Sequence, residues 1–172
     1  MHGFVTEPAC VQATPDFALG YWRDLFICCW RVRTTMEGAD ELQKHCAEFG
    51  RSRSEGIGLL TIIEANAPAP ENDARAAIAN FLGTADYIRG SGVAFEGTGF
   101  RAAAVRSIVS GLTMLARQPY QHKVFDAVPT TMAWLVPELT QHLSLDYAAA
   151  DAIDAVGRFR ARVDEEVPKR PY

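Results

Sequence analysis

Short hydrophobic runs separated by a polar turn mark the first regular part of the chain. Residues 17–22 and 25–33 are rich in aromatic and branched side chains, which favour strands, and only Arg23 and Asp24 lie between them. This pattern predicts a β-hairpin. The second strand begins as a continuous apolar run and ends in alternation, so we expect it to run from the centre of a sheet to an exposed end.

Further apolar runs predict inner strands. Residues 57–63 form an almost unbroken run between a glycine and a proline-containing loop, which is typical of a strand covered on both faces. Residues 93–96 predict a third core strand, and residues 122–125 predict a brief one. We expect the runs at 57–63 and 93–96 to be neighbours, so that the segments following them lie side by side.

Apolar side chains at a spacing of three or four residues predict the helices. The pattern favours helices over residues 36–49, after Pro70, over 100–117, from Pro129 and over 146–167. Strands that alternate with helices need crossover connections, which favour a largely parallel sheet. We therefore predict an α/β fold in which helices pack on a mixed, mostly parallel sheet of four or five strands with an N-terminal hairpin.

The expected organisation is one domain with two flanking segments. A chain of 172 residues with 48% hydrophobic residues is long enough to bury a continuous core. Residues 1–16 contain two prolines and little periodicity, so we expect a flexible lead-in. Residues 17–142 would form the α/β domain, and residues 143–172 a C-terminal helix packed on that domain or on a partner.

Charge and hydropathy argue against two classes of partner. The formal net charge of −4 gives no positive field that would hold a nucleic acid. No run approaches the roughly 18 apolar residues that a membrane span needs, and residues 1–16 lack a basic segment followed by an apolar one. We expect a cytoplasmic protein.

Cysteines and histidines do not form a recognisable metal pattern. The spacings of Cys10, Cys28, Cys29 and Cys46 are not those of paired zinc ligands, and we expect reduced, structural thiols. The four histidines are scattered, and His122 would titrate usefully only if a neighbour tuned it. The sequence therefore predicts no metal and no cofactor.

One glycine-containing turn is a candidate anion site. Gly97, Thr98 and Gly99 lie where a strand passes into a helix, so free backbone N–H groups there could hold an anion with Arg101 close by. The simpler interpretation is that these glycines permit a tight turn.

Polar residues also follow the strand at 57–63. In open α/β sheets, ligands bind beyond the carboxyl ends of the strands, so Glu64, Asn66 and Glu96 are expected to converge near Thr98 and Arg101. Acid–base work by Glu64 and Glu96 is conceivable, but solvated or helix-capping carboxylates are the more common case.

Over roughly residues 17–139 the predicted order of elements ends with Lys123-Val-Phe-Asp126 followed by Ala133-Trp-Leu135. This order and these residues resemble the STAS superfamily of sulfate transporter and anti-sigma factor antagonist domains, in its bacterial STAS-like branch. The resemblance implies a regulatory module that binds a protein partner. In the antagonists a serine after a central strand is phosphorylated, but residues 64–71 contain neither serine nor threonine.

Three functional hypotheses follow. The first is a non-enzymatic regulatory or interaction module that binds through the loops at Asn66 and Thr98. The second is a small-molecule or anion-binding protein, possibly an enzyme, that uses residues 97–99. The third is an assembly role in which Phe159 and its neighbours on the C-terminal helix join two copies of the chain or a larger partner.

Overall fold

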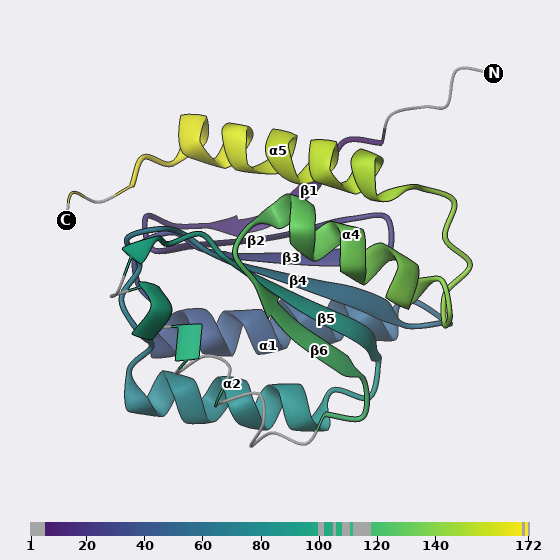
Figure 1. The fold of residues 1–172 in the computed structure, drawn as a ribbon, viewed down its shortest axis with the longest axis horizontal. Coiled ribbons are helices and arrows are strands. Elements are labelled where there is room, and N and C mark those ends of the chain that lie inside the picture. Colours follow the sequence, from purple (N-terminus) through teal and green to yellow (C-terminus); the bar gives the residue numbers. More distant parts are fainter. Residues whose placement is uncertain are drawn as a thin grey trace.

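A six-stranded mixed sheet forms the centre of the computed structural model, which describes residues 6–99, 102–104, 106–107, 111, 118–169 and 171 (Figure 1). The strands are β1 (Ala9–Ala13), β2 (Phe17–Trp22), β3 (Leu25–Trp30), β4 (Ile57–Ile63), β5 (Ile88–Phe95) and β6 (Gln121–Phe125). They lie in sequence order, antiparallel from β1 to β3 and parallel from β3 to β6. The α/β class is confirmed, and the predicted strand count was too low.

Strand β1 lies inside the segment that was expected to be a flexible lead-in. Its residues pair antiparallel with β2, and the Trp22 indole Nε1 donates a hydrogen bond to the Thr6 carbonyl at 2.7 Å. The prediction of a lead-in over residues 1–16 was therefore wrong for Ala9–Ala13. Main-chain pairing at a sheet edge needs no apolar pattern, so the local sequence did not reveal this strand.

Helices cover both faces of the sheet. On one face lie α1 (Met36–Arg51) and α2 (Asn72–Thr84), and on the other lie α4 (Val128–Leu139) and α5 (Ala149–Glu166), as Figure 1 shows. The hairpin, the strand at 57–63 and these four helices agree with the sequence predictions. The helix predicted over residues 100–117 lies largely outside the described residues.

Strand β3 supplies side chains to two separate cores because successive residues of a strand point to opposite faces. Cys28 packs in the core beneath α1 and α2, and its neighbour Cys29 packs in the core beneath α4 and α5. The predicted strand over residues 25–33 ends at Trp30, and the chain becomes exposed only at Arg33. Arg31 is only 1% exposed, because the C-terminal segment covers it.

The C-terminal helix α5 packs on the sheet of its own chain. Phe159 is 1% exposed and belongs to the core that β2, β3 and α4 also form. A Cβ atom on Gly20 of β2 would lie 2.5 Å from the Phe159 ring, so the close approach of helix and sheet requires glycine there. The apolar stripe of α5 is thus covered within the chain and is not free to join a second copy.

No helix among the described residues is both long enough and apolar enough to cross a membrane.

Candidate functional site

The segments that follow β4 and β5 leave the sheet side by side, as predicted. The two strands are parallel neighbours in which Ile63 lies opposite Phe95. The Glu96 N–H donates to the Ile63 carbonyl at 2.9 Å, and the Glu64 N–H donates to the Trp30 carbonyl at 3.0 Å. Both glutamates therefore start at the carboxyl edge of the parallel part of the sheet.

An arginine from α5 joins the two glutamates. The Arg160 guanidinium donates to both carboxylate oxygens of Glu96, at 2.6 and 2.7 Å, and to Glu64 Oε1 at 3.3 Å. A two-pronged arginine–carboxylate contact is a strong, directional hydrogen-bonded ion pair. Arg160 therefore ties the C-terminal helix to the ends of two inner strands.

The chain beyond α5 closes the same cluster. The Lys169 ammonium lies 2.5 Å from Glu64 Oε2. Nearby, the buried Arg31 guanidinium forms an ion pair with Asp164 at 2.9 Å and donates to the carbonyls of Val167 and Thr14, each at 2.6 Å. These contacts hold the end of α5 and the start of the hairpin close to the carboxyl ends of the parallel strands.

Both glutamates are held in ion pairs. Burial alone would lower the pKa of the Arg160 guanidinium, but the hydrogen bond and charge of Glu96 raise it above its usual value. The Glu64 side chain is 8% exposed and is held by two cations. The expectation of solvated or helix-capping carboxylates was wrong, because the C-terminal helix supplies ion-pair partners that the local sequence does not show.

The thiol beside this cluster is a poor nucleophile. Cys29 Sγ lies 3.5 Å from Glu64 Oε1, and burial followed by the charge of Glu64 raises the pKa of the thiol. All four cysteines are free, and Cys28 and Cys46 are also buried with raised pKa values. Within the described ranges, no three His, Cys, Asp or Glu side chains are placed to hold a metal ion.

Of the predicted surface, Asn66 and Thr98 are exposed beside the ion pairs. Gly97 is buried, and Gly99 is exposed with a φ of +83°, in the region that favours glycine. Arg101 lies outside the described residues, so the predicted anion site remains a prediction. The structure brings Glu64 and Glu96 together on Arg160, and Asn66 and Thr98, each two residues further along the chain, are exposed.

Sequence reasoning missed Arg160 and Lys169. One signal was present for the first of them: Arg160 lies four residues after Val156 and follows Phe159 directly, so helical spacing places it at the edge of the buried stripe. No comparable pattern marks Lys169, which lies beyond the helix.

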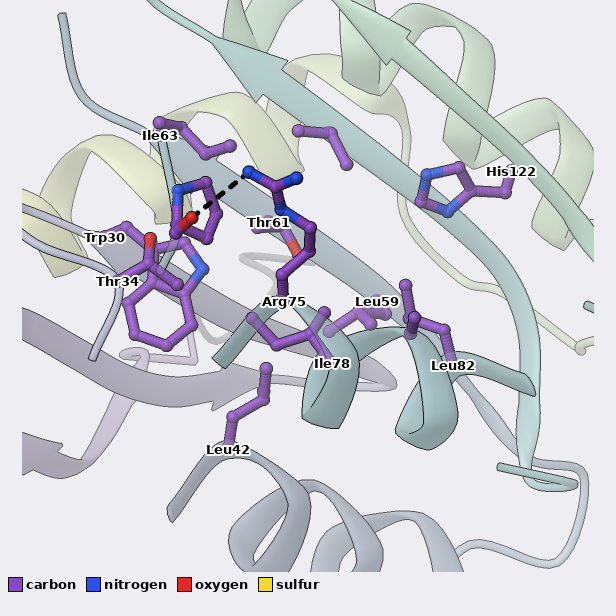
Figure 2. Close-up of a pocket in the computed structure, with 13 residues that line it drawn as sticks. Trp30, Thr34, Leu42, Leu59, Thr61, Ile63, Arg75, Ile78, Leu82 and His122 are labelled. Atoms are coloured by element: carbon purple, nitrogen blue, oxygen red, sulfur yellow. Dashed lines mark hydrogen bonds between the residues drawn. The ribbon is translucent and has the colours of Figure 1, made fainter. Parts of the chain in front are cut away.

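A second candidate site lies on the opposite face of the sheet, between α2 and strands β4 to β6 (Figure 2). It is a partly open cavity of about 60 Å³. The residues that line it are Trp30, Thr34, Leu42, Leu59, Thr61, Ile63, Pro70, Arg75, Ile78, Ala79, Leu82, Val93 and His122. Burial lowers the pKa of His122 from 6.5 to about 4, so its imidazole is neutral near pH 7.

The chain matches no protein-family model, no curated protein and no solved structure. The resemblance to STAS domains therefore remains a prediction from the order of elements.

Proposed function

We propose that the chain is a non-enzymatic, regulatory protein-interaction module of STAS-like type. It binds a protein partner through the surface around Asn66 and Thr98, at the carboxyl ends of β4 and β5. Because no hydroxyl residue occurs in residues 64–71, binding is not controlled by phosphorylation of that loop.

The observation that carries this proposal is the ion-pair network next to the surface. Glu64 and Glu96 are bound by Arg160, so they are unsuited to move protons in a reaction. The same contacts hold the exits of two strands and the end of α5 in one rigid arrangement. A preorganised edge with exposed polar side chains suits recognition, since little conformational entropy is lost when a partner binds.

Site-specific photo-crosslinking in the native host tests this proposal. A photoreactive amino acid at position 66 or 98 should give the same protein adduct from both positions. Placed at Asn80 or Thr84, exposed positions on the last turns of α2, it should not give that adduct. The change Thr98→Arg should abolish the adduct formed from position 66.

The absence of any adduct at 66 and 98, or the same adduct at all four positions, would contradict the proposed surface. Turnover of a small molecule that is lost in the Thr98→Arg variant would instead favour the enzyme hypothesis, which uses residues 97–99. The assembly hypothesis has no support from α5, because the Phe159 face is buried in its own chain.

A further inference from the structure

The cavity between α2 and the sheet is apolar over most of its wall. Leu42 of α1, Ile78 and Leu82 of α2, and Leu59 and Val93 of the sheet line it together with the Trp30 ring (Figure 2). A wall of this kind favours a hydrocarbon group, because moving apolar surface out of water lowers the free energy.

Polar atoms without partners interrupt this wall. The Nε atom of Arg75 and both ring nitrogens of His122 are buried and form no hydrogen bond within the part of the chain that the structure describes. Arg75 has one long contact, from Nη2 to the Pro70 carbonyl at 3.4 Å, and no ion pair among the described residues. In Figure 2 its side chain extends from α2 toward the middle of the cavity, and His122 lies on the far side, on β6.

A third partnerless group lies beside His122. Ser91 of β5 is opposite His122 in the strand register and is fully buried, and its Oγ has no hydrogen-bond partner among the described residues. Buried polar atoms in folded proteins nearly always have partners, so the unsatisfied atoms of Arg75 and His122 on the cavity wall need an explanation.

We propose that this cavity binds a small aliphatic carboxylate. The hydrocarbon part lies against the leucine and isoleucine side chains, and the carboxylate accepts hydrogen bonds from the Arg75 guanidinium and from the neutral His122 imidazole. The planar guanidinium matches a carboxylate in geometry as well as in charge. The site lies on the other face of the sheet from the ion-pair network and is independent of the function proposed above.

The size of the cavity limits the ligand. A water molecule needs roughly 10–15 Å³ in this measure of volume, so a cavity of about 60 Å³ accommodates only a few non-hydrogen atoms. Isovalerate, with seven non-hydrogen atoms, is at the upper limit, so it would fill the cavity and reach its open side. A long fatty acid would have to extend through the open side.

An NMR titration of the full chain at pH 7 tests the proposal, with isovalerate as the probe at up to about 20 mM, a range suited to a weak small ligand. The Trp30 indole N–H and the methyl groups of Thr61 and Leu82 should shift saturably. The Trp134 indole, on α4 and outside the lining, is the internal control.

Two ligand analogues and three variants separate the parts of the proposal. Isovaleramide has nearly the same shape without the charge, and acetate has the charge without the hydrocarbon; both should bind at least about tenfold more weakly. The change Arg75→Gln should weaken isovalerate binding by about tenfold or more, and Arg75→Lys should restore part of it. The change Arg51→Gln, at an exposed arginine of α1, should leave binding unchanged.

Equal binding of isovalerate and isovaleramide would overturn the role of the charge, and it requires no variant that might fail to fold. Equal binding of acetate would overturn the role of the apolar wall. No saturable shift, or shifts that include Trp134 equally, would overturn the site itself.

Discussion

At the scale of single residues, the burial of His122 makes stability depend on pH. Burial lowers its pKa from 6.5 to about 4. Between these values the unfolded chain binds a proton that the folded chain does not. The stabilisation is therefore complete above about pH 6.5 and is lost as the pH falls toward 4.

We expect the free energy of unfolding of the wild-type chain to fall between pH 7 and pH 4.5 by roughly 1–3 kcal/mol more than that of His122→Leu. Urea denaturation at both pH values measures the difference. A direct NMR titration of the imidazole should give a midpoint near pH 4. A midpoint at or above 6 would show that the ring is not desolvated as described.

Arg160 is the second residue with a large expected effect. The change Arg160→Met should lower the free energy of unfolding by about 2–4 kcal/mol, because it leaves the buried Glu64 carboxylate with Lys169 alone. Arg160→Lys should recover part of the loss. The control Arg162→Met removes an exposed ion pair on the same helix and should change stability by less than about 0.5 kcal/mol.

Urea denaturation of the three variants at pH 7 checks this expectation. A loss in Arg160→Met no larger than in Arg162→Met would mean that the network contributes little to holding α5.

At the scale of elements, the contact between α5 and β2 depends on a missing side chain. A Cβ atom on Gly20 would meet the Ala9 carbonyl oxygen and the Phe159 ring, so Gly20→Ala must push α5 or β1 away. We expect a loss of about 1–3 kcal/mol, as for other overpacked sites.

The matched change Gly157→Ala should act in the opposite direction. Gly157 lies within α5, and a Cβ atom there meets nothing within 4 Å. Alanine in a helix is favoured over glycine by about 0.5–1 kcal/mol, so this variant should melt at a higher temperature than the wild type. If both variants lost stability alike, the close approach at Gly20 would not be the cause. Thermal denaturation followed by circular dichroism distinguishes the two cases.

At the scale of the whole molecule, the order of the strands predicts a gradient of local stability. Strands β3 and β4 are paired on both sides and covered by helices on both faces, whereas β1 and β6 are the edges of the sheet. We expect amide hydrogens of β3 and β4 to exchange most slowly, and those of β1 and β6 to exchange fastest among the strands. Native-state hydrogen exchange followed by NMR measures this order, and equal protection in β6 and β4 would contradict it.

Much of this architecture could be predicted from local patterns. The bounds of β4 agree with the apolar run at 57–63, and β2, β3 and α1 lie where periodicity placed them. The neighbouring position of β4 and β5, on which the convergence of Glu64 and Glu96 depends, was also predicted correctly. These features follow from hydrophobic spacing, which acts over a few residues and can be read along the chain.

The candidate sites were less predictable because they join distant residues. Arg160 is 96 residues from Glu64, and nothing around either residue indicates the other. Arg75 and His122 likewise line one cavity only because α2 packs on the face of the sheet from which the His122 side chain of β6 projects. Their polar character is visible in the sequence, but their burial without partners is not.

The sequence by itself determined the α/β class, the strands after β1 and helices α1, α2, α4 and α5, because these depend on apolar spacing and turn residues. Only the tertiary structure decided that β1 pairs at the edge, that α5 covers its own sheet, and which charges meet. Main-chain pairing and ion pairs between distant segments depend on where the whole chain places them, and no local pattern carries that information.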